Sequence, residues 1–272
     1  MFVYPLNNIF FRQVPPNGQG IAGLIALKGI RTLEESKLCE DFNAETVSQS
    51  AGAFHAMIEM MRLGFGDARK YVCDTDYNKK NGYLNEPKES HSIGSNDWLL
   101  DDTRIANRAQ SLFESNKAVV QGEPHRTSCT VSFQVVDKEG NAISFVNRLV
   151  IPFSILHFFL LTSLNIYCIH NYFHLSLSLS NFMGFGTGIV PDGCGFTLQN
   201  RGYGFSFDQS SPNAIAPSKR PYHTIIPGML TYADTNELYA TLSNMGGFMQ
   251  PQGHMQLTIA MVAGNLDPQV RL

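Results

Sequence analysis

The sequence has little net charge and no basic excess. Its 272 residues include 20 Lys and Arg against 23 Asp and Glu, a formal net charge of -3. Proteins that bind nucleic acid usually carry a basic patch or stripe for the phosphates. The composition therefore argues against nucleic acid as a partner. The length is sufficient for a sizeable core in one or two domains.

Cysteine is scarce, and its spacing forms no pairs. The five cysteines are scattered and odd in number: Cys39, Cys73, Cys129, Cys168 and Cys194. A disulfide framework or a zinc site normally shows paired spacing such as Cys-X-X-Cys. The eight histidines do not cluster at ligand spacing either. We therefore predict no disulfide framework and no metal site.

The N-terminus lacks the features of a secretory signal. The opening residues, Met-Phe-Val-Tyr-Pro-Leu, provide no charged n-region, and no small-residue cleavage site follows them. We therefore expect no signal peptide, which favours a cytoplasmic location.

One block has no Asp, Glu, Lys or Arg at all. Between Leu149 and Leu179 the sequence is dominated by Leu, Phe, Ile and Ser. By length and hydropathy alone the block is a candidate to cross a bilayer. Pro152, three histidines and two asparagines argue against a clean span. A membrane segment, a family-specific loop and an insertion are the three interpretations of this block.

The clearest local pattern follows Thr130. Residues 131–136 alternate as in a strand, residues 137–141 have turn chemistry, and residues 142–146 form the return strand. If the peptide bond before Thr130 is cut, the new α-amine can act as general base for the Thr130 hydroxyl. Threonine is also common in strands, so a purely structural role stays open on this pattern alone.

Helices are predicted on both sides of this hairpin. We expect one over Ile21–Ile30, and a longer one that begins after Asn43. A further helix should be capped by Asp101 or Asp102, and a last one should cover Pro251–Ala263. The longer helix is expected to bury one apolar stripe: Val47, Ala51, Phe54, Ile58, Met61, Phe65 and Ala68. Near its end, Asp67 and Arg69 are expected to form a surface ion pair.

Five segments, in order, resemble the γ-glutamyltranspeptidase family. Members of this family are N-terminal-nucleophile hydrolases that cut themselves before a threonine. The segments are Val14-Pro-Pro-Asn-Gly-Gln-Gly20, Thr130 to Ser144, Gly184-Phe-Gly-Thr-Gly-Ile189, Lys219-Arg-Pro-Tyr-His-Thr224 and Met245-Gly-Gly247. The resemblance covers nearly the whole chain apart from the uncharged block. Leu198-Gln-Asn-Arg-Gly202 is similar to the transpeptidase-like, acylase-like branch.

The resemblance implies an α+β fold, a four-layer αββα sandwich that is incomplete in this chain. Residues 1–129 would be the C-terminal part of the large-subunit region, and residues 130–272 the small-subunit region. Family members are longer, so we interpret the chain as a fragment at both ends. The two regions would pair as large and small subunits after self-cleavage.

The uncharged block interrupts this resemblance. Without residues 148–179, Asn147 and Ser180 read as one continuous family motif. We therefore interpret the block as an insertion, such as translated intron sequence. The family has a Ser or Thr directly after the position of Asn147, where this chain has Arg148. An insertion there is expected to break the strand path, because pairing follows register and turn geometry.

The resemblance assigns catalytic roles to four residues. Thr130 would be the nucleophile, and Ser180 would orient it once the block is removed. Gly246 and Gly247 would form the oxyanion hole, because consecutive glycines can direct two amide donors at one point. Two glycines alone are usually a turn, so their order after the hairpin carries the catalytic interpretation.

Three further residues are predicted to bind substrate. Arg201 and Gly204 stand where the family uses acidic and amide side chains to hold a γ-glutamyl α-amino group. An arginine suits a carboxylate instead, through bidentate pairing. His223 and Thr224 stand where transpeptidases have paired serines, and both can hydrogen-bond an anion. A plain loop before a strand over Thr224–Tyr232 is the alternative for those two.

The function that the resemblance implies is acyl transfer without a cofactor. The enzyme would move a γ-glutamyl or related acyl group from a glutathione-like amide to water or an acceptor amine. One alternative is a non-catalytic, truncated remnant of the family. The other is a related amide acylase with a non-glutamyl substrate.

Overall fold

Strands from both ends of the chain form one sheet. The computed structural model describes residues 2–13, 17–81, 97–118, 131–147, 164–169, 172–179 and 181–269. The first sheet has the order β1-β2-β7-β8, and every neighbouring pair is antiparallel. Its strands are β1 (Phe2–Leu6), β2 (Ile9–Gln13), β7 (Gly228–Tyr232) and β8 (Leu238–Leu242). Segments before and after the proposed cleavage site therefore share a sheet.

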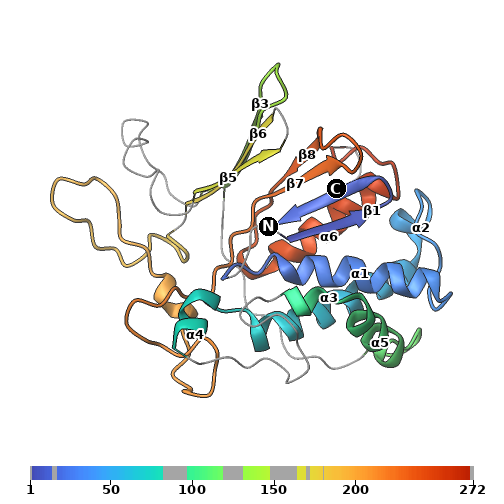
Figure 1. Ribbon diagram of the computed structural model, residues 1–272, viewed down its shortest axis with the longest axis horizontal. Helices are drawn as coiled ribbons and strands as arrows, with labels where there is room; N and C mark the ends of the chain where they lie inside the picture. Colours follow the sequence, from blue (N-terminus) through green and yellow to red (C-terminus); the bar gives the residue numbers. More distant parts are fainter. Residues whose placement is uncertain are drawn as a thin grey trace.

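Helix α1 is the centre of the helical part. It contacts α3, α5, α6 and β1, and Figure 1 shows it between the first sheet and the outer helices. The helices are α1 (Ile21–Glu35), α2 (Thr46–Gln49), α3 (Ala51–Tyr71), α4 (Thr75–Lys80), α5 (Asp102–Leu112) and α6 (Gln250–Val262). Seven consecutive residues of α1, from Ile21 to Leu27, are buried, as expected for a helix covered on all sides.

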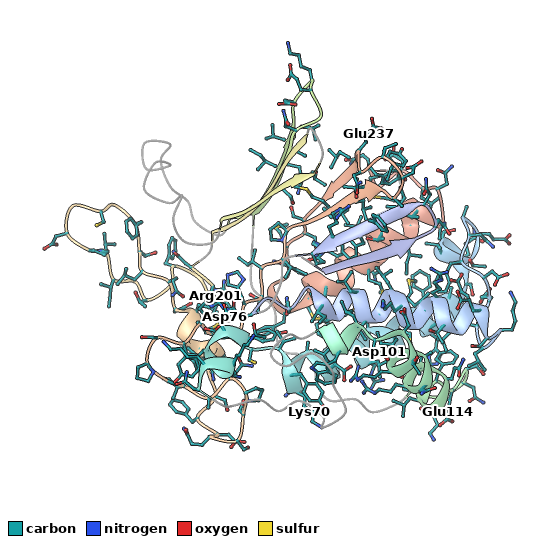
Figure 2. All side chains as sticks on the ribbon, in the orientation of Figure 1. Lys70, Asp76, Asp101, Glu114, Arg201 and Glu237 are labelled. Carbon is teal, nitrogen blue, oxygen red and sulfur yellow. The ribbon has the colours of Figure 1, made fainter. Side chains whose placement is uncertain are left out.

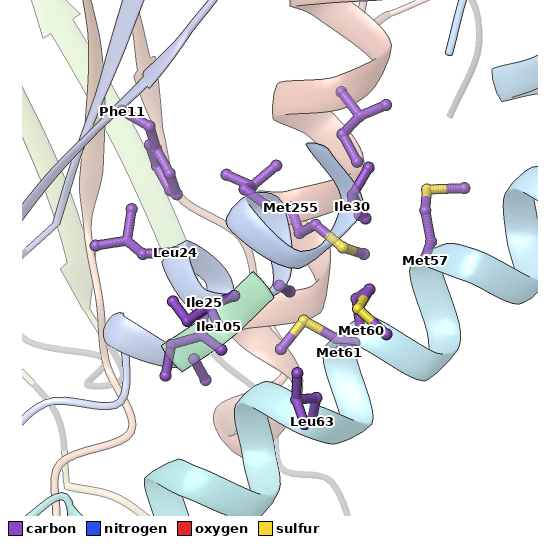
Figure 3. Close-up of a cluster of buried hydrophobic side chains, with 14 of the residues drawn as sticks. Phe11, Leu24, Ile25, Ile30, Met57, Met60, Met61, Leu63, Ile105 and Met255 are labelled. Carbon is purple, nitrogen blue, oxygen red and sulfur yellow. The ribbon is translucent and has the colours of Figure 1, made fainter. Parts of the chain in front are cut away.

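The main core lies between α1, α3, α6 and the first sheet. Figure 3 shows Leu24 and Ile25 of α1, Met60 of α3 and Met255 of α6 in one cluster with Phe11 of β2. All five side chains are at most 2% exposed. Flexible methionine side chains fill irregular gaps between helices, so they suit this junction.

Helices α1 and α3 approach each other closely at Gly64. A Cβ atom added to Gly64 would lie 2.3 Å from the backbone oxygen of Ala22, which cannot move aside easily. We expect Gly64→Ala to lower the free energy of unfolding by about 1–3 kcal/mol through overpacking. Gly52→Ala on the same helix is the matched control, because its Cβ would meet only the flexible end of Glu40. Denaturant unfolding that finds the two variants equally stable would contradict this packing.

The long helix begins later than predicted. Asn43 instead lies in the turn before α2, where its Oδ1 accepts hydrogen bonds from the amides of Glu45 and Thr46. Helix α3 starts at Ala51, and the Ser50 hydroxyl caps it by accepting from the amide of Ala53. The prediction was wrong because Ser50 takes an extended conformation that separates the two helices.

The predicted apolar stripe of α3 is also partly wrong. Phe54 and Ile58 are 41% and 54% exposed, whereas Met57 and Met60 are buried. The side of α3 that faces α1 carries small residues such as Gly64, which permit the close approach. Close helix packing therefore buries the face that carries Met57, Met60 and Gly64, and it leaves Phe54 and Ile58 exposed.

Asp67 does not form a surface pair with Arg69 as predicted. Its carboxylate is 3% exposed and accepts from Arg104 at 2.8 Å and from Arg108, both on α5. The buried carboxylate thus ties α3 to α5. Asp101 caps α5 as expected, because its Oδ1 accepts from the amide of Arg104 at 2.8 Å.

The second sheet contains the predicted hairpin and part of the uncharged block. Its order is β3-β4-β6-β5, with β3 (Val131–Val136), β4 (Ala142–Asn147), β5 (Leu164–Ile169) and β6 (Tyr172–Leu179). β3 and β4 pair over six residues, so the hairpin prediction is confirmed. β4 ends at Asn147, directly before the block, and β6 pairs with β4 in parallel over its full length.

The two sheets meet through β4 and β8. The Ser144 hydroxyl donates to the carbonyl of Leu242 at 3.0 Å, and Gln134 donates to the Ser243 hydroxyl. The mixed α/β character of the fold is confirmed, and the complete four-layer sandwich stays a prediction. Among the helices in the described ranges, none is long and apolar enough to span a membrane. Residues 148–163 lie outside those ranges.

Candidate functional site

The structure links the described candidate residues to one another. Thr130 and Ser180 lie outside the described residues. The other five predicted site residues fall on three segments: Arg201, the pair His223 and Thr224, and the pair Gly246 and Gly247. Direct hydrogen bonds and one bridging side chain connect these segments.

Arg201 and Thr224 bind each other. Arg201 starts a short 3-10 helix and is labelled in Figure 2; it is only 5% exposed. Its Nη1 donates to the Thr224 hydroxyl at 3.0 Å, and its guanidinium carbon lies 4.7 Å from the ring centre of Phe182. The cation is therefore fixed by a hydrogen bond and by the face of an aromatic ring. The sequence identified both residues, but it did not indicate that they touch.

His223 is held in its neutral form. Burial and the nearby positive charge of Arg201 lower the pKa of His223 to about 3. Its Nδ1 lies 3.1 Å from the carbonyl oxygen of Ile225 and 3.3 Å from the Ile225 amide nitrogen. At neutral pH the ring can exchange hydrogen bonds with a ligand, but it cannot supply a positive charge.

The glycine pair lies at the start of α6. Gly246 and Gly247 have φ angles of +133° and +57°, in the region that favours glycine. A short 3-10 helix, Gly247–Met249, follows and leads directly into α6. The amide of Met249 donates to the carbonyl of Gly246 at 3.0 Å. A helix N-terminus is a favourable location for amide groups that must bind a negative oxygen.

Gln19 bridges two of these segments and was missed by sequence reasoning. Its side-chain nitrogen donates to the carbonyls of Thr224 and Gly247, both at 2.7 Å, and its side-chain oxygen accepts from the Tyr222 hydroxyl at 3.3 Å. The residue is fully buried. Its segment, Val14 to Gly20, is one of the five that resemble the family, but the resemblance assigned no role to Gln19 itself.

The backbone around Gln19 pairs with the His223 segment. The Gln19 amide donates to the carbonyl of His223 at 3.0 Å, and the His223 amide donates to the carbonyl of Asn17 at 2.9 Å. The turn that precedes α1 is thereby joined to the chain that leads into β7. Two of the five resembling segments are thus neighbours in space.

A buried polar row on α6 anchors the helix behind the glycine pair. Gln250, His254 and Thr258 recur every four residues and are fully buried. The Gln250 side chain accepts from the amide of Ile226 at 3.1 Å, and His254 Nδ1 lies 2.8 Å from the side-chain nitrogen of Gln13. The spacing of these residues was visible in the sequence, but their burial was not.

His254 should make stability depend on pH. Burial lowers the pKa of His254 to about 3, from an ordinary value of 6.5. Below pH 6.5 the unfolded chain gains a proton that the folded chain refuses, so the free energy of unfolding falls as pH falls. The contribution of one such histidine is up to about 1.4 kcal/mol per pH unit. His223 has a lowered pKa as well and acts in the same direction.

The variant His254→Asn keeps an acceptor for Gln13 but removes the titration. We expect its unfolding free energy to change less steeply between pH 6.5 and 5 than that of the parent, in denaturant titrations at fixed pH. Thr258→Val is the control on the same buried row, since it alters packing without removing a titrating group. An unchanged slope in His254→Asn would show that His254 is protonated in the folded state.

Comparison with known proteins agrees with the predicted family. The sequence matches the γ-glutamyltranspeptidase family over residues 5–154 and 170–272. It is 24% identical over 259 residues to the glutathione hydrolase-like YwrD proenzyme of Bacillus subtilis, which covers 94% of this chain and 38% of that protein. It is 25% identical over 230 residues to the oxamate amidohydrolase proenzyme of Klebsiella pneumoniae, covering 85% and 33% respectively.

A solved structure is also similar. The cephalosporin acylase from Bacillus halodurans is 30% identical, with a TM-score of 0.66, over 98% of this chain and 38% of that one. The relatives that the chain matches include an acylase, an amidohydrolase and a glutathione hydrolase-like protein. The chain belongs to the γ-glutamyltranspeptidase family, as predicted. It spans just over a third of the length of the acylase and of the glutathione hydrolase-like relative.

Proposed function

We propose that this chain carries the catalytic region of an amidohydrolase that cuts itself before Thr130. The observation that carries the proposal is the link from Arg201 through Thr224 and Gln19 to Gly247. This link joins a candidate substrate contact to a candidate oxyanion hole. The named relatives include an amidohydrolase, an acylase and a glutathione hydrolase-like protein, so cleavage at an amide is the common element.

The proposed reaction uses one residue as nucleophile and base. The Thr130 hydroxyl attacks the amide carbonyl carbon, and the Thr130 α-amine accepts the hydroxyl proton. The amides of Gly246 and Gly247 bind the oxyanion of the tetrahedral intermediate. The C–N bond then breaks, the departing amine takes the proton, and an ester to Thr130 remains. Water or an acceptor amine attacks this ester and regenerates Thr130. No cofactor takes part.

Arg201 supports an acyl group that bears a carboxylate. A buried guanidinium, oriented by Thr224 and Phe182, is suited to an anionic group near the wall of the site. A γ-glutamyl amide such as glutathione carries carboxylates, and so do many other acyl donors. The neutral ring of His223 would add a hydrogen bond without adding charge. An acylase with a non-glutamyl, carboxylate-bearing substrate is therefore the second candidate.

We also propose that residues 1–129 belong to the large-subunit region and residues 130–272 to the small-subunit region. Residues 148–179 are then an insertion in the small-subunit region. Two observations support the insertion. The family match leaves out residues 155–169. In the second sheet, Leu179 at the end of β6 is the parallel partner of Asn147 at the end of β4. Both strands therefore finish side by side at the same end of the sheet. Completion of the four-layer sandwich around this sheet is part of the same proposal.

The mass of the expressed chain tests the proposed function. An active nucleophile is expected to give two fragments that meet at Cys129–Thr130. An uncut chain would favour the non-catalytic remnant. Once cleavage is seen, p-nitroanilides of γ-glutamate and of other dicarboxylic acids would separate the two substrate candidates.

A further inference from the structure

We propose that Gln19 is a positioning residue, which fixes the Gly246–Gly247 turn and the segment around Thr224 relative to each other. The inference rests on the proposed function, because it concerns the geometry of the same site. Gln19 belongs to the turn before α1, far in sequence from both segments that it holds. No sequence feature assigned it a role.

The Gln19 side chain uses both of its donors and its acceptor. A glutamine amide offers two N–H donors and a carbonyl oxygen with two lone pairs. The two donors contact the carbonyls of Thr224 and Gly247 at 2.7 Å each, and the acceptor receives the Tyr222 hydroxyl at 3.3 Å. These contacts are fully buried, so water does not compete for them. Removal of the amide would leave two buried carbonyls without this donor.

The glycine pair needs an external restraint of this kind. Glycine has the largest conformational freedom of any residue, and two in succession have no side chain with which to fix the turn. An oxyanion hole functions only when its donors are oriented before the reaction. The Gly246 carbonyl accepts from the amide of Met249, and the Gly247 carbonyl accepts both from the amide of Gln250 and from the Gln19 side chain. Gln19 therefore adds a restraint from outside the turn to the peptide that follows Gly247.

The same side chain also holds Thr224, which binds Arg201. The Thr224 carbonyl accepts a hydrogen bond from Gln19, and the Thr224 hydroxyl accepts one from Arg201. A shift of Gln19 would thus move the candidate oxyanion donors and the candidate carboxylate contact together. This arrangement makes Gln19 more than a local packing residue, because it links the part that binds the acyl group to the part that stabilises the transition state.

Gln19→Met is the informative variant. Methionine has a similar length and removes both donors while it preserves most of the volume. Tyr222→Phe is the matched control, because it removes only the hydroxyl that binds the Gln19 acceptor and leaves both donor contacts in place. In Gln19→Met we expect kcat for a p-nitroanilide substrate to fall roughly 100-fold, as for a displaced catalytic group, and KM for a carboxylate-bearing substrate to rise, because the contact with Arg201 is displaced as well. Tyr222→Phe should keep kcat within a few-fold of the parent.

Hydrogen exchange measures the link without reference to turnover. Peptides that contain Ile225 and Ile226, and peptides that contain Met249, carry amides with hydrogen bonds in the two segments. Gln19→Met is expected to speed exchange in both sets together, while Tyr222→Phe leaves both near the parent rates. Unchanged exchange in Gln19→Met would overturn the inference.

The activity readout separates positioning from mere structural support. Faster exchange with unchanged kcat would show that Gln19 holds the segments but does not orient the donors, and would overturn the catalytic role. A fall in kcat together with a rise in KM for the carboxylate-bearing substrate would support it. If the parent itself remains uncut at Cys129–Thr130 and turns over no amide, the proposed function fails and the catalytic role fails with it. The exchange data then report only on the fold.

Discussion

Thr130→Ala is expected to leave the chain in one piece. The proposed cleavage uses the Thr130 hydroxyl to attack the peptide bond that precedes it, and alanine has no nucleophile at that position. Amide hydrolysis should be lost as well, by roughly a million-fold if the loss resembles that of other hydroxyl nucleophiles. Intact mass spectrometry of the purified protein would show one species instead of two.

Two variants make this experiment specific. Thr130→Ser keeps a hydroxyl and an α-amine in the same place, so it should still cut, although at a changed rate. Thr127→Ala removes a hydroxyl three residues before Thr130, and this variant should cleave itself at the same rate as the parent. Cleavage that persists in Thr130→Ala would exclude Thr130 as the nucleophile, and fragments of the same mass would then point to another protease.

Removal of residues 148–179 is expected to speed self-cleavage. The deletion joins Asn147 to Ser180, which places a hydroxyl residue directly after Asn147, where the family has one that orients the nucleophile. The sheet geometry permits the join, because Leu179 is the parallel partner of Asn147. Neighbouring strands lie about 4.8 Å apart, and consecutive Cα atoms lie roughly 3.8 Å apart. The new peptide bond between Asn147 and Ser180 therefore requires the chain after residue 179 to shift sideways by only about one strand spacing.

Arg148→Ser is the matched control for this deletion. It provides a hydroxyl after Asn147 while the block stays in the chain. Faster cleavage in the deletion alone would assign the effect to the block, and faster cleavage in both would assign it to the hydroxyl. A deletion product that loses its circular dichroism signal would show that β5 and β6 are required for the second sheet, because β4 would then present an unpaired edge. A folded but uncut product would favour the remnant.

Local patterns predicted the elements well where side chains alternate or cap within a few residues. The hairpin of β3 and β4 follows from period-2 alternation around a turn, and the pairing register agrees with it. The cap at Asp101 follows from the chemistry of its own side chain. Both features depend on contacts between residues close in sequence, so the sequence alone contains their physical cause.

Predictions failed where a distant segment decided the outcome. Phe54 and Ile58 extend an apolar pattern, yet they are exposed because α3 packs against α1 through the face that carries Met60 and Gly64. Asp67 looked like a surface charge, but two arginines of α5 make its burial possible. In each case a neighbouring helix, α1 or α5, determined which side chains of α3 are buried, and its position depends on the packing of the whole fold.

The candidate site shows the same division. The sequence by itself determined the family, the hairpin behind Thr130 and the identities of Arg201, Thr224 and the glycine pair, because these depend on residue types in a fixed order. Only the tertiary structure decided that Arg201 binds Thr224 and that Gln19 holds Thr224 and Gly247 together. Those bonds join residues that are 23 to 228 positions apart, and only the packing of α1, α6 and the first sheet brings such residues within hydrogen-bonding distance.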